Sequence, residues 1–350
     1  MMPFDQLPIF VRETGLIRDV VESLNKSGMR ISLVTDGERR LLATVTDGDI
    51  RRGLLSGFGL DDSVLKLGGR EFVSAIESAS VQDLQMALVS SGVSHLPILD
   101  ESGRVIGMFP ETRNVSPTTL GNVVVIMAGG LGMRLRPMTD TIPKPMLRVA
   151  GKPMLEHIVE NLRLEGFTDF IISINYLGEI IKEHFGDGSQ HGVNITYISE
   201  DKPLGTAGAL SLIPQNFSQP FVVLNGDVLV KAKIREMLDF HLGHGAELTV
   251  GVKVLDTQIP FGVVTLKNGR ILALEEKPTY RDFVNAGIYV LSPEVLDDIP
   301  VNQKFDMTDL VANKIEGGGP MAFPLHESWI DLGRPEDFER ADQTYGEESR

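Results

Sequence analysis

Hydrophobic and polar positions follow two different arrangements along this chain, and the change between them falls near residue 118. After that point, short apolar or alternating runs suited to strands are separated by runs with helical spacing. The strand-like runs are 123–127, 170–175, 195–198, 221–224 and 248–254, and the helical runs are 154–165, 179–184, 206–212 and 233–241. This order predicts an α/β domain with a doubly wound, mainly parallel sheet, whose ligands bind at the carboxyl ends of the strands.

The first 118 residues contain a weak internal repeat in which a helix precedes a β-hairpin. One half has helical spacing at 16–27 and strand-like runs at 31–35 and 41–46, followed by a helix from Asp49. The other half has a helical run at 81–91 and strand-like runs at 96–99 and 105–109. The sequence therefore predicts an α+β module with halves 1–63 and 64–118, a polar linker at 119–122, and the α/β domain at 123–345.

This repeat resembles a tandem CBS module, also called a Bateman module, which commonly binds adenine nucleotides in a central cleft. Thr46 and Asp49 match the T-x-x-D of that family, in which the Asp receives ribose hydroxyls. Pro110 and Arg113 occupy the equivalent positions of the second half. The resemblance implies at most one AMP or ATP site, and a homo-oligomer because CBS pairs often associate face to face. Asp49 could equally cap the helix that follows it.

Composition excludes several classes of protein. The 350 residues carry a net charge of −15, which argues against wrapping DNA or RNA, because phosphate backbones need a basic surface. There are no cysteines, so disulfides and thiolate metal sites are excluded. We expect a cytoplasmic protein with no membrane partner, since neither a signal peptide nor a long apolar run is present.

The first apolar run of the α/β domain leads into a glycine-rich segment, Ala128-Gly129-Gly130-Leu131-Gly132. Glycines let a backbone approach a polyphosphate and turn its N–H groups toward it. Leu135 stands where a dinucleotide-binding fingerprint needs its last glycine, and Met133-Arg134 stands where a Walker loop needs Lys-Ser/Thr. Both of those motifs are therefore excluded.

The segment continues as G-G-x-G-x-R-L-x-P-x-T, with Pro143-Lys144-Pro145 downstream. This resembles the signature of the sugar-1-phosphate nucleotidyltransferases, whose fold is a Rossmann-like, GT-A-like sheet. The resemblance implies that Arg134 and Lys144 are catalytic, and both side chains suit phosphate oxygens. The loop residues that it implies for nucleotide binding are Ala128, Gly129, Gly130 and Gly132.

The reaction of that family is attack of a sugar phosphate oxygen on the α-phosphorus of a nucleoside triphosphate, with release of pyrophosphate. The attacking oxygen is already ionised, so catalysis depends on positioning and on neutralising charge, and we expect Mg²⁺ on one or two carboxylates. Asp227 ends a buried strand pattern and matches the family's G-D; Asp331 matches its W-x-D-x-G. Either residue alone could cap a helix or form a turn. Together with the loop they are predicted metal ligands.

The resemblance also assigns residues to the sugar. Gly262 follows Pro-Phe, Glu276 and Lys277 belong to an E-K-P, and Asn285 begins an N-A-G-x-Y. It implies that all four bind the sugar and that Lys277 is also catalytic, gripping the sugar phosphate. A solvated turn is the alternative for Glu276 and Lys277. We expect the pair His241 and His244 to be an exposed helix end rather than a metal site, because no third ligand stands at a suggestive spacing.

The base-recognition loop of the family corresponds to the segment that holds Glu200, Gly205 and Thr206. A carboxylate only accepts hydrogen bonds, which suits the two adjacent donors of guanine and favours GTP. The segment also resembles guanylyltransferases for mannose- and heptose-type 1-phosphates. With a CBS pair in front, the chain resembles the glucosamine-1-phosphate guanylyltransferases of legionaminic acid synthesis. A mannose-1-phosphate guanylyltransferase, a uridylyl- or thymidylyltransferase and a non-catalytic nucleotide sensor remain open alternatives.

Overall fold

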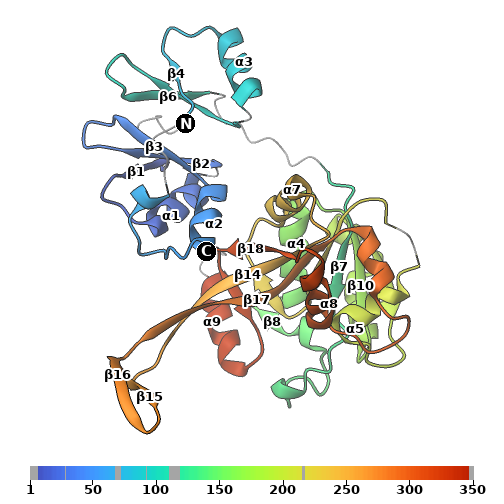
Figure 1. The fold of residues 1–350 in the computed structure, drawn as a ribbon. Helices are drawn as coiled ribbons and strands as arrows, with labels where there is room; N and C mark the ends of the chain where they lie inside the picture. The colour runs from blue at the N-terminus through green and yellow to red at the C-terminus, as the bar shows by residue number, and fades with distance from the viewer. Residues whose placement is uncertain are drawn as a thin grey trace. The chain divides into compact units, whose positions relative to one another are not determined.

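The computed structural model describes residues 7–27, 29–67, 72–91, 93–109, 119–214 and 217–346. The chain divides into two compact units, Met1–Ser116 and Pro117–Arg350 (Figure 1). Pro110 and Arg113, expected at the second CBS position, lie outside the described residues. Residues 119–122, which the sequence suggests as a linker, are attached to the second unit. There Leu120 forms a bridge with Phe167, and the amide of Asn122 donates to the carbonyl of Pro220 at 2.7 Å.

The first unit consists of two similar halves, as the internal repeat predicts. The first half contains β1 (Phe10–Arg12), α1 (Ile17–Ser27), β2 (Ile31–Thr35), β3 (Leu41–Thr46), α2 (Asp47–Leu55) and a short 3-10 turn at Val64–Lys66. The second half contains β4 (Ala75–Ile76), α3 (Val81–Ser91), β5 (Leu96–Leu99) and β6 (Val105–Phe109). In each half a parallel strand joins an antiparallel hairpin, which gives the sheets β1-β2-β3 and β4-β5-β6.

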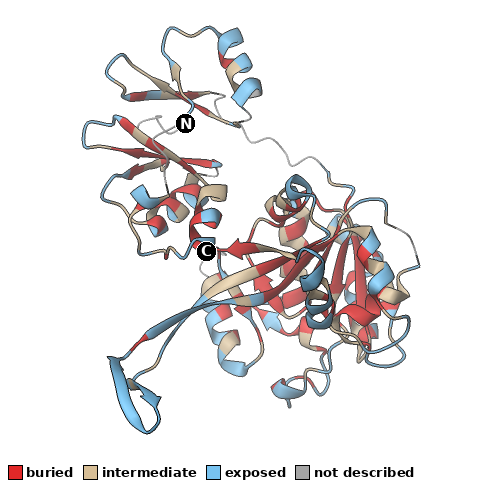
Figure 2. Cartoon of the chain, viewed as in Figure 1, coloured by how far each residue is buried: buried red, intermediate tan, exposed pale blue. Residues whose placement is uncertain are grey.

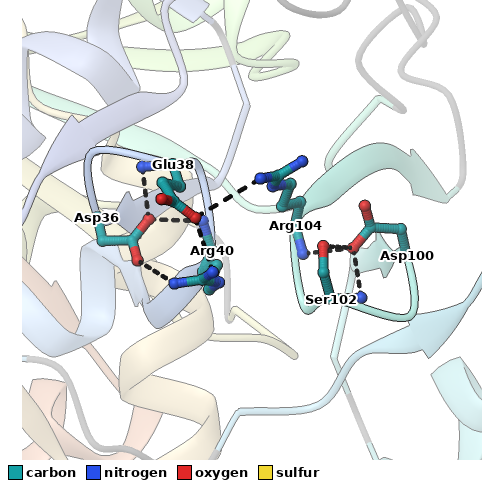
Figure 3. A network of polar contacts seen from close by, with 6 residues as sticks. All are labelled: Asp36, Glu38, Arg40, Asp100, Ser102 and Arg104. Atoms are coloured by element: carbon teal, nitrogen blue, oxygen red, sulfur yellow. Dashed lines mark hydrogen bonds and ion pairs between the residues drawn. The ribbon is translucent and has the colours of Figure 1, made fainter.

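The turns of the two hairpins repeat the same local chemistry and contact each other. The carboxylate of Asp36 accepts from the backbone N–H of Arg40 at 2.9 Å, and that of Asp100 accepts from the N–H of Arg104 at 2.8 Å. The side chain of Glu38 lies 2.7 Å from Arg40 and 3.5 Å from Arg104, so one carboxylate joins both turns. This pairing orients the halves of the first unit. Figure 3 shows the network of Asp36, Glu38, Arg40, Asp100, Ser102 and Arg104.

The second unit is built on a seven-stranded sheet in the order β11-β10-β7-β12-β17-β14-β18. Its strands are β7 (Val124–Met127), β10 (Asp169–Ile174), β11 (Asn194–Ser199), β12 (Phe221–Asn225), β14 (Leu248–Gln258), β17 (Thr279–Leu291) and β18 (Met321–Leu325). β17 runs antiparallel to both of its neighbours, and the other pairings in this sheet are parallel. The expected mainly parallel α/β sheet is thus confirmed.

Both faces of this sheet are covered by helices. Successive residues of a buried strand point to opposite sides, so neighbouring residues of β7 enter different cores. Val124 and Ile126 pack in a core with α4 (Met154–Leu164), α5 (Gly178–Phe185), α7 (Ile234–His244) and α9 (Pro335–Gly346). Val125 packs on the other side with residues of α6 (Gly205–Gly208) and α8 (Met307–Lys314).

The strand order reverses at β7, which has β10 on one side and β12 on the other. The segments that follow β7, β11 and β12 therefore leave the sheet at one edge, where ligands bind in sheets of this kind. Beside this edge two short strands pair, β13 (Val228–Val230) and β19 (Trp329–Asp331), and a further small pair joins β8 (Arg148–Val149) to β9 (Lys152–Pro153).

β14 and β17 extend beyond the sheet as a two-stranded ribbon, here residues 255–283 (Figure 1). The ladder between them continues to the pair Gln258 and Thr279, and the N–H of Ile259 donates to the carbonyl of Pro278 at 3.0 Å. At its end lies a hairpin of β15 (Gly262–Lys267) and β16 (Arg270–Glu276). The ribbon is mostly exposed (Figure 2).

Two expectations from the sequence can be compared directly with these elements. His241 is wrongly expected at an exposed helix end: its side chain is buried, and its ring nitrogens lie 2.9 Å from the hydroxyl of Thr249 and 3.1 Å from that of Ser292.

Within the described part of the chain, no helix has both the length and the apolar character needed to cross a membrane.

Candidate active site

The glycine-rich loop after β7 is shaped by positions that admit no side chain. Gly132 has φ +61°, and a Cβ there would lie 2.8 Å from a methyl carbon of Thr139, whose hydroxyl donates to the Gly132 carbonyl at 2.8 Å. A Cβ on Gly129 would lie 2.6 Å from a carboxylate oxygen of Glu200. The loop therefore offers backbone rather than side chains to the space beside it.

That space is a cleft of two adjoining cavities, of about 340 and 380 Å³, which share Gly130, Leu131, Lys144 and Asp227. The first cavity is also lined by Ala128, Gly129, Glu200, Gly205 and Thr206. The second cavity is also lined by Gly132, Arg134 and Asp331. The structure thus brings the predicted nucleotide-binding and metal-binding residues, with Arg134 and Lys144, to the carboxyl edge of the sheet.

Lys144 and Asp227 form an ion pair at the junction of the two cavities. The Nζ of Lys144 lies 2.6 Å from one carboxylate oxygen of Asp227, and the lysine side chain is only 13% exposed. Lys144 begins a 3-10 turn, Lys144–Met146, whereas Asp227 follows β12. Two segments far apart in sequence therefore place opposite charges where a polyphosphate would meet the loop.

The second carboxylate, Asp331, is held beside the first by backbone pairing. Val228 pairs with Asp331 between β13 and β19, and the N–H of Leu332 donates to the carbonyl of Asp227 at 3.1 Å. Burial raises the pKa of Asp331, and the neighbouring charge of Asp227 raises it further. Two carboxylates that repel each other in a cleft form an oxygen-only donor set, which fits Mg²⁺.

Glu200 lies at the carboxyl end of β11 and borders the first cavity. One of its oxygens accepts from the hydroxyl of Ser173 at 2.8 Å, and the other accepts from the N–H of Leu204 at 2.9 Å. A carboxylate has about four acceptor sites, so each oxygen keeps capacity for one more donor. Protein contacts therefore orient this side chain without using all of its acceptors.

Gly205 and Thr206 border the same cavity and are anchored to the start of α8. Gly205 has φ +79°, and the N–H of Thr206 donates to Asp306 at 3.0 Å. The hydroxyl of Thr206 accepts from the N–H of Met307 at 2.9 Å. The side chain of Thr206 thus has a structural partner.

The residues predicted for the sugar are not brought to this cleft. Gly262, Glu276 and Lys277 lie on the exposed ribbon, and neither cavity includes them. β14 and β17 pair continuously from Val252 and Asn285 to Gln258 and Thr279, and the hairpin that carries these residues follows that end of the ladder. Asn285 lies closer to the sheet, but its amide donates to the hydroxyl of Tyr289 at 2.7 Å and accepts from the N–H of Gly287 at 3.0 Å.

In the first unit, Thr46 and Asp49 form a capping box at the start of α2. One carboxylate oxygen of Asp49 accepts from the N–H of Thr46 at 2.8 Å and from its hydroxyl at 2.6 Å. The other oxygen accepts from the guanidinium of Arg52. The helix-capping alternative for Asp49 is therefore present in the structure.

Asn225 is a residue of the first cavity that the sequence motifs did not assign. Its side-chain oxygen is buried and accepts no hydrogen bond from the described residues. Buried amide oxygens are usually paired, so an unpaired one beside a cavity is a candidate for contact with a ligand. Asn225 is the last residue of the buried strand β12 and stands two positions before Asp227. This position in the sequence is the signal that could have identified it.

Comparisons with known proteins agree with this geometry. A model of the nucleotidyl transferase family matches residues 123–348, which is well over half of the chain. The chain belongs to the nucleotidyl transferase family. A CBS domain model matches residues 68–113 of this nucleotidyl transferase.

Two curated relatives differ in the nucleotide that their names specify. A UTP–glucose-1-phosphate uridylyltransferase of Synechocystis sp. is 36% identical over 238 residues, covering 62% of this chain and 61% of its own. A mannose-1-phosphate guanyltransferase of Saccharomyces cerevisiae is 36% identical over 225 residues, covering 61% and 62%. The chain thus spans about three fifths of the length of these relatives.

Solved structures show the same fold. A putative glucose-1-phosphate thymidylyltransferase of Bacillus anthracis is 27% identical with a TM-score of 0.54, over 64% of this chain and 94% of its own. HddC of Yersinia pseudotuberculosis is 28% identical with a TM-score of 0.51, over 64% and 99%.

Proposed function

We propose that this nucleotidyl transferase joins a nucleoside monophosphate to a sugar 1-phosphate and releases pyrophosphate. The observation that carries the proposal is the convergence of the glycine loop, Arg134, Lys144, Asp227 and Asp331 on one cleft. The names of the relatives specify transfer to sugar 1-phosphates, which supports the same reaction.

In this proposal the cleft residues position the triphosphate and neutralise its charge. The loop lets the polyphosphate approach the backbone, while Lys144 and Arg134 supply cations for phosphate oxygens. Asp227 and Asp331 would hold Mg²⁺, which when bound offsets charge on the triphosphate. No residue has to act as a general base, because the attacking oxygen of a sugar phosphate is already ionised at neutral pH.

We further propose GTP as the triphosphate and glucosamine 1-phosphate as the acceptor. The choice of GTP rests on Glu200, whose oxygens keep acceptor capacity at the edge of the first cavity. The acceptor rests on the resemblance to guanylyltransferases of legionaminic acid synthesis, which also carry a CBS pair. Mannose 1-phosphate is the second candidate acceptor, and UTP and dTTP are the alternative triphosphates.

The test measures pyrophosphate release in the presence of Mg²⁺. ATP, CTP, GTP, UTP and dTTP are each combined with glucosamine 1-phosphate, glucose 1-phosphate and mannose 1-phosphate. We expect the fastest release with GTP and glucosamine 1-phosphate. A clear preference for UTP or dTTP would overturn the assignment of GTP. No pyrophosphate with any pair would leave a non-catalytic nucleotide sensor as the better description.

For the first unit we propose that AMP or ATP binds near Thr46 and Asp49 and alters activity. The support is the match of these residues to the CBS pattern, although Asp49 also caps α2. Calorimetry of the full chain with AMP and with ATP tests this. We expect heat from at least one nucleotide, abolished in Thr46→Val. Heat from neither would remove the regulatory proposal.

A further inference from the structure

Ser173 places a hydroxyl inside the sheet, near the end of a strand that is otherwise apolar there. Residues 170–172 and residue 174 of β10 are phenylalanine or isoleucine, and Ser173 itself is fully buried. Ile171, on the same side of the strand, and Ile198, its partner on β11, both belong to the apolar core of that face. A hydroxyl that is buried without a hydrogen bond costs free energy, so the partner of Ser173 is informative.

That partner is the carboxylate of Glu200. The hydroxyl of Ser173 donates to Oε1 of Glu200 at 2.8 Å, and the N–H of Leu204 donates to Oε2 at 2.9 Å. Oε1 also lies against the glycine loop, because a Cβ on Gly129 would come within 2.6 Å of it. The carboxylate is therefore held at both of its oxygens, by two segments that are far apart in sequence.

The backbone of Glu200 is fixed by other contacts. Its N–H donates to the carbonyl of Ile174 at 3.0 Å, and its carbonyl accepts from the side-chain amide of Asn175 at 3.0 Å. The main chain is thus held in place without the hydroxyl of Ser173. What that hydroxyl controls is the orientation of the carboxylate.

The orientation matters because two adjacent donors of a base need both carboxylate oxygens in one plane. A carboxylate held at one oxygen can turn about that contact, whereas contacts at both oxygens fix its plane. We propose that Ser173 is a positioning residue for base selection, whose hydroxyl holds the carboxylate of Glu200 in the orientation that accepts from guanine. This inference rests on the proposed role of Glu200 in binding GTP.

Calorimetry of the full chain with GTP and with UTP, in the presence of Mg²⁺ and without sugar phosphate, tests the proposal through the ratio of the two dissociation constants. We expect Ser173→Ala to lower the preference for GTP by ~10-fold, because the carboxylate loses one of its two contacts. Ser173→Thr keeps a hydroxyl and should keep most of the preference. The matched control is Thr249→Val, which removes a buried hydroxyl of the same sheet that contacts His241, and it should leave the ratio unchanged.

A double-mutant cycle separates positioning from a purely structural role. In a Glu200→Ala background the hydroxyl has no carboxylate to orient, so adding Ser173→Ala should not change the ratio further. Circular dichroism checks that each variant is folded.

Three results would overturn the proposal. They are a wild-type ratio in Ser173→Ala, a further fall when that change is added to Glu200→Ala, and a wild type that binds UTP as tightly as GTP. Pyrophosphate release is measured separately. A lowered GTP preference in Ser173→Ala, in a protein that releases no pyrophosphate, would support this inference and contradict only the proposed reaction.

Discussion

The cleft and the ribbon belong to the same unit and share strands of one sheet, but they differ in what surrounds their charged residues. In the cleft, Lys144 and Asp331 are held by segments that follow different strands and come together at one edge. On the ribbon, Glu276 ends β16, which pairs with β15, and Lys277 follows it; both side chains are exposed. Sequence motifs pointed to both regions.

Separate segments of the chain come together around the charged motif residues of the cleft, but not around those of the ribbon. The cleft combines opposite charges in a partly buried space, where electrostatic interactions are stronger than in water. The ribbon has no such enclosure, and the feature that distinguishes it is apolar surface. We therefore associate the proposed reaction with the cleft.

The largest expected effect belongs to the cleft. Asp227→Asn should lower kcat/KM for pyrophosphate release by ~10³-fold, because it removes a charge from the ion pair with Lys144 and a ligand from the proposed Mg²⁺ site. The matched control is Asp256→Asn, which removes an exposed carboxylate paired with Arg281 on the ribbon. Equal losses in both variants would remove the distinction between the two regions.

The next effect concerns the base. Glu200→Gln keeps a side-chain oxygen for one protein contact but loses the charge that, under the proposed GTP specificity, accepts the two guanine donors. We expect the preference for GTP over UTP to fall by ~10- to 100-fold, measured as the ratio of the two kcat/KM values. Asn225→Ala tests the unassigned neighbour in the same assay. An unchanged ratio in Glu200→Gln would show that another group selects the base.

A smaller effect is expected on the ribbon. Lys277 is exposed and lies outside both cavities, so Lys277→Ala should change kcat/KM for the sugar 1-phosphate by less than ~10-fold. The assay is the same pyrophosphate release, with sugar 1-phosphate varied. A loss as large as that of Asp227→Asn would show that Lys277 contacts the sugar phosphate during the reaction, as the family resemblance implies.

The last prediction concerns a residue outside both regions and is expected to affect stability alone. Burial raises the pKa of Glu165 from 4.5 to about 7, and its carboxylate accepts from the N–H of Arg235 at 2.8 Å, in the first turn of α7. Because the folded state binds this proton more tightly than the unfolded state, its contribution to stability is present below pH 4.5 and is lost as pH rises toward 7.

The measurement is the free energy of unfolding at several pH values, for the wild type and for Glu165→Gln. Relative to the variant, the wild type should lose roughly 3 kcal/mol between pH 4.5 and 7.5. The rate of pyrophosphate release at neutral pH should be the same in both. Parallel pH profiles of stability would show that Glu165 ionises normally.

The sequence predicted the strands and helices of both units closely, because their apolar periodicity reflects burial. The expected strands at 96–99 and 105–109 coincide with β5 and β6, and that at 31–35 with β2. It did not predict that β14 and β17 continue into a ribbon. The ribbon's exposed strands lack the burial that makes periodicity informative, and its bounds depend on pairing between segments about 20 residues apart.

The sequence predicted many of the residues that line the cleft, but not the contacts between them. Strand ends place Asp227 and Glu200 at one edge, which follows from topology alone. The ion pair between Lys144 and Asp227 and the unpaired oxygen of Asn225 depend on loop conformation. The buried state of His241 was missed because its partners, Thr249 and Ser292, come from different strand ends. Such contacts leave no periodic trace in the sequence.

The central claim is that the cleft transfers a nucleoside monophosphate to a sugar phosphate, and ³¹P NMR of the reaction with GTP, glucosamine 1-phosphate and Mg²⁺ tests it most directly. We predict that the triphosphate and sugar phosphate signals are replaced by pyrophosphate and by a new sugar-linked diphosphate, and that Asp227→Asn leaves them unchanged. Formation of orthophosphate and GDP, or an unaltered spectrum with every sugar phosphate, would contradict the account.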